Sequence, residues 1–300
     1  MGFLERASFL MIGLMIITHA NLALELKSAM EHMIGNQNDI EILSITPEDD
    51  IDIQKNNIEL KFSRQNSLTV LSRMEILAEL MRLKYGISIT GSHGKTTTTS
   101  LLSHIMYKNK LDPTYLIGGK LKTDDPHVKL GNSHYLVTDK YESDPSFSKL
   151  TPHLVVLTNL DRELLDNYNN SYTILEASML ELMNSIPFYG KVFVNGDDKN
   201  SIKLLSKINR AVCTFGLNKK NNIIAKSIKY IDGKKMQFDV IFSKRTYKVC
   251  TNLLGKHNVY NILSAISVCL HLGISICLLY TSDAAYERSS VDLGGRRIIK

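Results

Sequence analysis

Apolar runs and amphipathic stretches alternate along the chain from residue 85 onward. Five short apolar runs predict buried strands, namely Gly86–Thr90, Tyr135–Thr138, Leu154–Thr158, Lys191–Asn195 and Ala211–Phe215. Apolar residues at helical spacing predict helices between some of these strands, namely Thr96–Asn109, Ser171–Ser185 and Lys199–Lys207. Strands that alternate with helices are typical of an α/β fold with a mostly parallel sheet flanked by helices.

The pattern changes after Gly216. Three segments alternate apolar and polar residues at every second position, namely Asn222–Tyr230, Lys235–Ser243 and Arg245–Cys250. This alternation predicts a small antiparallel layer with one buried face. A further helix is predicted over Asn258–Leu272.

Residues 1–20 allow two interpretations. Arg6, the apolar run Ala7–Ile17 and the small residues around Ala20 have the outline of a signal peptide. The alternative is a strand over Met11–Ile17, a loop that carries His19, an amphipathic helix and a second strand over Glu41–Ile45. In that helix, apolar residues line one side, namely Leu22, Leu26, Ala29, Met30 and Met33. We favour the alternative because the residues that follow also fit it.

Composition excludes some classes of protein. The net charge of +6 suits anionic ligands such as nucleotides, but a Lys-, Asn- and Ile-rich composition gives the same excess without functional meaning. No compact Lys/Arg run is interleaved with aromatic residues, so we expect no nucleic acid partner. The four cysteines form no C-x-x-C pair, which indicates a reduced, cytoplasmic chain. No apolar run reaches the roughly 18 residues that a membrane span requires.

The segment Gly91-Ser92-His93-Gly94-Lys95-Thr96 lies between a predicted strand and a predicted helix. Glycines let the backbone turn tightly and approach a phosphate, and the N–H groups at the helix start favour an anion. Lys95 would supply a positive charge, and the Thr96 hydroxyl would complete a Mg2+ shell. The alternative is a glycine-containing turn before an ordinary helix. The preceding strand and the following run of threonines favour a phosphate-binding loop.

An ordered series of motifs resembles the Mur ligases, over residues 68–273. The phosphate loop continues into Thr97-Thr98-Thr99, and further matching segments follow, namely Glu142-Ser143-Asp144, Thr158-Asn159-Leu160-Asp161, Pro187-Phe188-Tyr189-Gly190 and Gly255-Lys256-His257-Asn258-Val259-Tyr260-Asn261. The resemblance is strongest to the branch that joins L-alanine to UDP-N-acetylmuramate through an acyl phosphate. It implies ATP and Mg2+ as cofactors and these two molecules as substrates.

The resemblance also implies roles for individual residues. It implies catalytic roles for Lys95, Glu142 and Asn159, and it makes Thr96 and Glu142 metal ligands. It implies nucleotide contacts for Gly91, Ser92, His93, Gly94, Lys95, Thr96, Thr97, His257, Asn258 and Asn261. From the residues alone, Glu142 also suits a solvated loop, and Asn258 also suits a helix cap with His257 on the surface.

One position departs from the family in a way that bears on catalysis. The family has a histidine where this chain has Leu164. That histidine helps to bind a second metal, and leucine cannot ligate a cation. The resemblance therefore implies impaired ligase activity.

The N-terminal segment resembles the mannose-family IIA phosphocarriers of the sugar phosphotransferase system. The match runs through Met11–Ala23, Ala29–Gly35 and Ile45–Asp50. In that family the histidine after the first strand carries a phosphoryl group, which the resemblance transfers to His19. A polar loop histidine without that function is the alternative.

The last residues, 277–300, resemble conceptually translated sequencing adapter. We therefore expect a partial IIA-like α/β piece at 1–63, a junction at 64–70, a Mur ligase central ATP-binding domain at 71–276 and a non-native, disordered tail. The favoured function is an incomplete, impaired ligase. The alternatives are a phosphocarrier and a chimeric assembly product without function. The sequence gives no indication of oligomeric state.

Overall fold

A computed structural model of the chain describes residues 14–19, 27–28, 30–31, 35, 40–45, 69–70, 73–117, 128–139, 150–161, 168 and 171–274. The chain divides into two compact units, Met1–Leu77 and Ala78–Lys300. The expected tail at 277–300 lies outside the described residues.

The first unit contains a small parallel sheet with the strand order β2-β1-β3. Its strands are β1 (Leu14–His19), β2 (Ile40–Ile45) and β3 (Thr69–Val70). His19 is the last residue of β1 and pairs with Ile45, so its predicted place in a following loop is wrong. The ladder to β2 extends the strand two residues beyond the predicted end. β3 falls within residues 64–70, which the sequence assigned to a junction.

Helix α4 (Arg73–Leu83) leads into the second unit, which contains a ten-stranded sheet. The strand order is β13-β12-β11-β10-β9-β8-β4-β7-β5-β6. The parallel strands are β4 (Tyr85–Thr90), β5 (Thr114–Leu116), β7 (Tyr135–Asp139), β8 (Leu154–Leu157), β9 (Lys191–Asn195) and β10 (Ala211–Gly216). The predicted α/β class and its mostly parallel sheet are confirmed.

Both ends of this sheet are antiparallel. On one side, β6 (Val128–Lys129) pairs with β5. On the other, β11 (Ile223–Ile231), β12 (Lys235–Phe242) and β13 (Arg245–Thr251) form the antiparallel layer that the alternation predicted. β11 also pairs in parallel with the end of β10, so this layer continues the same sheet.

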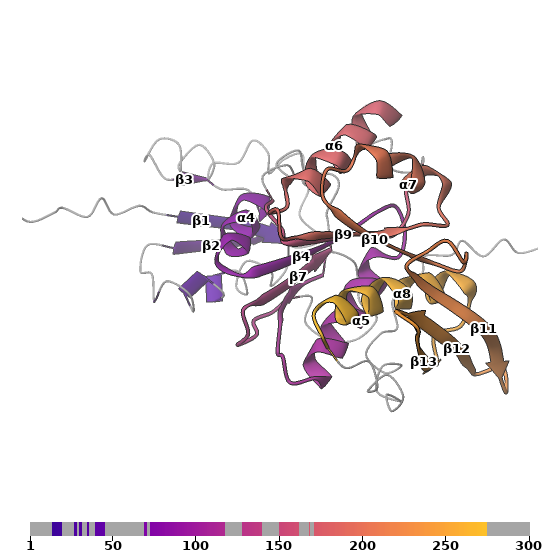
Figure 1. Ribbon diagram of the computed structural model, residues 1–300. Helices are drawn as coiled ribbons and strands as arrows, with labels where there is room; N and C mark the ends of the chain where they lie inside the picture. The colour runs from indigo at the N-terminus through magenta and orange to yellow at the C-terminus, as the bar shows by residue number, and fades with distance from the viewer. Residues whose placement is uncertain are drawn as a thin grey trace, which may run out of the picture. The chain divides into compact units, whose positions relative to one another are not determined.

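The helices of the second unit cover both faces of the sheet (Figure 1). α5 (Lys95–Lys108) and α8 (Lys256–His271) lie on one face. α6 (Tyr172–Ser185) and α7 (Lys199–Leu204), with the 3-10 turn η3 (Leu205–Lys207), lie on the other. The predicted helices are confirmed within one or two residues at most ends.

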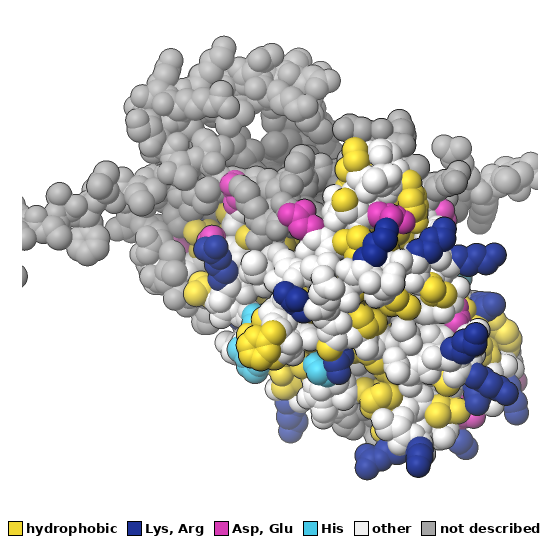
Figure 2. Space-filling view, turned by 45° about the horizontal axis from the view of Figure 1, so that its top comes forward, with side chains coloured by type: hydrophobic (Ala, Val, Ile, Leu, Met, Phe, Trp, Pro, Cys, Tyr) yellow, Lys and Arg dark blue, Asp and Glu magenta, His cyan; other side chains and the backbone are white. Residues whose placement is uncertain are grey.

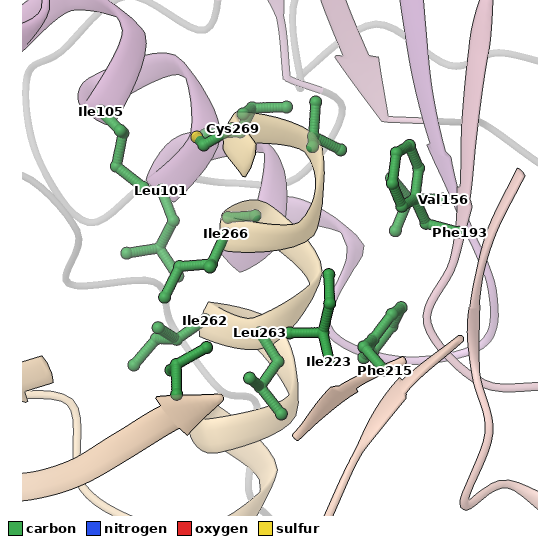
Figure 3. Close-up of a cluster of buried hydrophobic side chains, with 14 of the residues drawn as sticks. Leu101, Ile105, Val156, Phe193, Phe215, Ile223, Ile262, Leu263, Ile266 and Cys269 are labelled. Atoms are coloured by element: carbon green, nitrogen blue, oxygen red, sulfur yellow. The ribbon is translucent and has the colours of Figure 1, made fainter. Parts of the chain in front are cut away.

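The main core lies between the sheet and the pair α5 and α8. Figure 3 shows α8 with Leu101 and Ile105 of α5 on one side and Phe193 and Phe215 of the strands on the other. These four side chains are at most 5% exposed. Burying such side chains removes apolar surface from water, which is the main force that holds the layers together.

The surface of the second unit carries scattered charge. Figure 2 shows Lys and Arg side chains as separate groups on the face that it draws. Among the described residues, no helix combines the length and the apolar character needed to cross a bilayer.

Aromatic side chains gather at the amino ends of the parallel strands. The ring of His153, just before β8, stacks on Tyr85 at a centroid distance of 4.4 Å. The Gly86 N–H donates to His153 Nδ1 at 3.2 Å, and the His153 N–H donates to the Gly86 carbonyl at 2.8 Å. Burial lowers the pKa of His153, so the folded protein favours the neutral ring.

The first prediction concerns pH. Because the pKa of His153 is lower in the folded state, its contribution to stability is complete above the unfolded pKa of about 6.5 and declines as pH falls below it. His153→Asn retains an acceptor for the Gly86 N–H and cannot be protonated. Urea unfolding between pH 8 and 5.5 should show a smaller loss of midpoint in this variant than in the wild type. Equal losses in both proteins would contradict the assignment. Burial also lowers the pKa of His271. Because His271 is present in both proteins, its effect on the pH dependence of stability cancels in the comparison.

Candidate functional site

The candidate site lies at the carboxyl ends of the parallel strands, where ligands bind in sheets of this kind. The loop Gly91–Gly94 connects β4 to α5. Gly91 has a φ of 124° and Gly94 a φ of 80°, which a residue with a side chain rarely adopts. A Cβ on Gly91 would also overlap Thr158, and one on Gly94 would overlap the amide oxygen of Asn261. Both glycines are therefore required by conformation and by space.

The segment after β8 holds the loop in place. The Asn159 side chain accepts from the His93 N–H at 2.8 Å and donates to the His93 carbonyl at 3.0 Å. The Asn159 carbonyl accepts from the Ser92 N–H at 3.0 Å, and Thr158 Oγ1 donates to the His93 carbonyl at 2.7 Å. The Asp161 N–H donates to Ser92 Oγ at 2.6 Å. The structure thus gives Asn159 a clamping role, because its amide is engaged at both ends with the loop.

The first turn of α5 offers positive charge to a ligand. The helical ladder begins with the Thr98 N–H donating to the Gly94 carbonyl at 2.9 Å, so the N–H groups of the preceding turn are not used by the ladder. No acidic residue lies in that turn. Lys95 Nζ donates to the carbonyls of Gly91, at 2.5 Å, and Ser92, at 3.2 Å, which holds the ammonium group over the loop. A helix start of this kind favours an anion.

Asp139 belongs to the site, although the sequence analysis did not identify it. It is the last residue of β7 and pairs with Ile89 of β4, directly before the loop. Thr96 Oγ1 donates to its carboxylate at 3.0 Å, and Asp139 is only 5% exposed. An acidic residue that ends a buried strand at the carboxyl edge was the available signal.

The remaining positions of the predicted metal site lie outside the described residues. Glu142 and Leu164 lie in segments whose structure is not described. Thr97, in the first turn of α5, is buried, with 6% of its surface exposed. Within the described residues, no group of three or more His, Cys, Asp or Glu side chains is arranged to hold a metal by itself.

Helix α8 lies against the loop at Gly94, through Asn261. It begins at Lys256 after Gly255, whose φ is 100°. The alternative in which Asn258 caps the helix is wrong, because Asn258 Nδ2 instead donates to the Leu254 carbonyl at 2.8 Å. Asn261 Nδ2 donates to Asn258 Oδ1 at 3.1 Å, which fixes the amide oxygen of Asn261 beside Gly94. His257 is exposed on the first turn of the helix.

The structure therefore brings together most of the residues that the sequence singled out. Asn159 contacts the loop at His93 and Asn261 contacts it at Gly94, and Asn258 is hydrogen-bonded to Asn261. His257 has no described contact with the loop, although it occupies the same helical turn as Asn258.

Comparisons with known families agree with this geometry. The Mur ligase middle-domain family matches residues 89–269, which is more than half of the chain. The fructose IIA component of the phosphotransferase system matches residues 13–72.

Curated relatives match over the same region. A UDP-N-acetylmuramate–L-alanine ligase of Vesicomyosocius okutanii is 42% identical over 237 residues, which cover 78% of this chain and 50% of that protein. The ligase of the same name from Endomicrobium trichonymphae is 42% identical over 224 residues, or 74% and 49% of the two chains. The chain thus spans about half the length of the curated relatives it matches.

Solved structures share the fold. A UDP-N-acetylmuramate–alanine ligase of Thermotoga maritima has a TM-score of 0.68 at 21% identity, covering 89% of this chain and 67% of that one. A murein peptide ligase of Psychrobacter arcticus has a TM-score of 0.70 at 19% identity, covering 93% and 68%. A MurF ligase of Thermotoga maritima in complex with ADP has a TM-score of 0.57 at 15% identity, covering 93% and 63%.

The second prediction tests the space at Gly94. Gly94→Ala and Gly233→Ala both place a side chain at positive φ, which costs about 1 kcal/mol. Only at Gly94 does the new Cβ meet another group, since nothing lies within 4 Å of a Cβ on Gly233. Overlap in a packed region costs about 1–3 kcal/mol more. Urea unfolding should therefore show the larger loss of unfolding free energy for Gly94→Ala, and equal losses would contradict this account.

Proposed function

The chain belongs to the Mur ligase family through its middle domain, and on that premise we propose that its loop 91–96 binds the phosphates of ATP. The observation that carries the proposal is the start of α5. There the helix begins after Gly94 in the left-handed conformation, and the Lys95 ammonium group is held at the carbonyls of the preceding loop. Phosphate oxygens accept hydrogen bonds from backbone N–H groups, and their charge is matched by lysine and by the helix dipole.

The donor set beside the loop also fits Mg2+. This ion takes hard oxygen ligands and characteristically binds one or two protein groups together with substrate phosphates. The Thr96 hydroxyl and the Asp139 carboxylate lie 3.0 Å apart at the loop and are ligands of this type. When bound, the ion would neutralise charge on the phosphates during transfer. Thr96 and Asp139 are therefore the described residues proposed to hold it.

The first turn of α8 is proposed to receive the nucleoside part of ATP. Asn261 contacts the phosphate loop at Gly94, and Asn258 and exposed His257 lie one turn earlier on the helix. A ligand whose phosphates occupy the loop would therefore extend toward these side chains. Their amide and imidazole groups can donate and accept hydrogen bonds, as a purine and a ribose require.

The relatives support a substrate class. Proteins that are 42% identical over this region are named UDP-N-acetylmuramate–L-alanine ligases, and this supports the same ligation for the protein to which this domain belongs. In such a ligation the muramyl carboxylate takes the terminal phosphoryl group of ATP, giving ADP and an acyl phosphate. The alanine amine then attacks the acyl carbon, and phosphate leaves as the amide forms. Lys95 and the first turn of α5 would hold the phosphoryl group that is transferred.

The third prediction tests nucleotide binding. Titration calorimetry of the full chain with ATP, with and without Mg2+, should show binding that Lys95→Met weakens by about tenfold or more, because a charge-assisted contact is lost. Asp139→Asn should remove most of the Mg2+-dependent gain while retaining Mg2+-free binding. Lys108→Met, at the exposed far end of the same helix, is the matched control and should bind as the wild type does.

Two results would contradict the proposal. The first is a wild-type chain that gives no ATP binding at millimolar concentration. The second is a Lys95→Met variant that loses no more affinity than Lys108→Met, since the loop would then have no part in binding.

A second candidate function concerns the first unit. The IIA-component family matches residues 13–72, and His19 ends β1 at the carboxyl end of a parallel strand pair. Catalytic groups are commonly carried at that edge of a parallel sheet. These observations support a phosphocarrier role in which His19 accepts a phosphoryl group from a partner protein.

The fourth prediction tests this candidate. Incubation with a radiolabelled, phosphorylated histidine phosphocarrier should label the chain, with the acid lability and base stability of a phosphohistidine. His19→Ala should remove the label, and the control His134→Ala, in the other unit, should retain it. Label that persists in His19→Ala would exclude this role.

A further inference from the structure

A chain of hydrogen bonds runs away from the phosphate loop along the strand ends. Thr158 Oγ1 donates to the carbonyl of His93 in the loop at 2.7 Å. The Thr158 carbonyl accepts from Asn195 Nδ2, at the end of β9, at 2.9 Å. Asn195 Oδ1 in turn accepts from the Asp197 N–H at 3.1 Å. Thr158 and Asn195 are 3% and 6% exposed, so these bonds are shielded from water.

Asp197 is the point at which several segments meet. Its carboxylate accepts from the N–H groups of Leu217, at 2.5 Å, and Asn218, at 3.2 Å, and from Asn221 Nδ2 at 2.9 Å. A Cβ on Gly216 would lie only 2.7 Å from this carboxylate. The β9–α7 connection and the β10–β11 connection are therefore fixed to each other around one charged group.

Tyr260 brings α8 into this network. Its hydroxyl donates to Asp197 Oδ2 at 3.1 Å. Burial and the charge of Asp197 raise the pKa of Tyr260 to about 12, so the hydroxyl remains a donor at neutral pH. The other side-chain hydrogen bonds that α8 donates stay within the helix or reach the adjoining Leu254. Tyr260 thus ties the helix to the strand ends.

Asn261, the residue after Tyr260, completes a closed series of contacts, here called the circuit, that runs from the loop through Thr158, Asn195 and Asp197 to α8 and back to the loop. Asn261 lies against Gly94, so two consecutive residues of α8 contact Asp197 and the phosphate loop. The rest of the helix is held by apolar side chains such as Ile262 and Ile266, which Figure 3 shows packed in the core. Apolar contacts are non-directional, whereas a hydrogen bond fixes both distance and rotation.

From this circuit we propose that Tyr260 and Asp197 are a positioning pair, which sets the first turn of α8 relative to the phosphate loop. The pair thereby controls the affinity for the nucleoside part of the ligand, whereas the phosphate part depends on the loop, which Asn159 and Thr158 hold without α8. The inference rests on the proposed function, because it assigns the phosphates to loop 91–96 and the nucleoside to α8.

The fifth prediction separates these two parts of the ligand. The full chain and its Tyr260→Phe variant are titrated with MgATP and with magnesium tripolyphosphate, which has the phosphates but no nucleoside. Tyr260→Phe should weaken ATP binding by about tenfold, because a hydrogen bond to a charged group is lost. Its affinity for tripolyphosphate should stay within about twofold of the wild-type value. Ser264→Ala removes a hydrogen bond that is internal to α8 and should change neither affinity.

Each other outcome has a definite meaning. If Tyr260→Phe weakens both ligands equally, or neither, the pair does not position the nucleoside site and the inference is wrong, while the proposed function stands. If the wild type binds neither ligand, the proposed function fails and the inference fails with it. Thermal unfolding checks that each variant is folded. Should Tyr260→Phe not fold, Asp197→Asn replaces it in the same titrations and should give the same difference between the ligands.

Discussion

The close approach of α8 to the phosphate loop at Gly94 is the constraint on which the site depends. No side chain fits at this position, because Asn261 occupies the space that a Cβ would need. The Asn159 side chain engages both the N–H and the carbonyl of His93. The loop backbone is therefore fixed by Asn159, while Asn261, from a distant part of the sequence, lies against it at Gly94. Its N–H groups are oriented before any ligand arrives, which lowers the entropic cost of binding.

This arrangement also determines what a phosphate must displace. Lys95 Nζ donates to the carbonyls of Gly91 and Ser92, so its hydrogen-bonding capacity is partly used within the loop. An ammonium group has three N–H donors. A bound phosphate oxygen can accept from one of these donors or displace a loop carbonyl as its acceptor. The charge of Lys95 is thus held at the site at little entropic cost, while the strength of the new contact is reduced by the bond that it replaces.

The sequence predicted the strands and long helices because their apolar residues recur at the spacings that burial requires. It could not predict β5 and β6, since strands of two or three residues have no periodicity to detect. It placed the start of α8 at Asn258 because asparagine is a common cap, whereas Gly255 at positive φ starts the helix earlier. The sequence analysis gave Asn159 a catalytic role. It could not predict the hydrogen bonds between Asn159 and His93, because these residues are far apart in the sequence and meet only in the folded structure.

Asp139 and Asp197 lie at the same edge of the sheet, and their hydrogen-bond partners indicate different roles. Asp139 and Asp197 each follow or end a buried strand, so the sequence alone does not distinguish them. Asp197 accepts from two backbone N–H groups, an amide and a phenol, and these donors occupy most of the lone-pair sites that a carboxylate has. It is suited to joining segments. Asp139 accepts a hydrogen bond from Thr96 of the loop, and this position is the reason for proposing it as a ligand of a phosphate-bound cation. Position relative to the loop, rather than residue type, therefore separates the proposed positioning group from the proposed metal ligand.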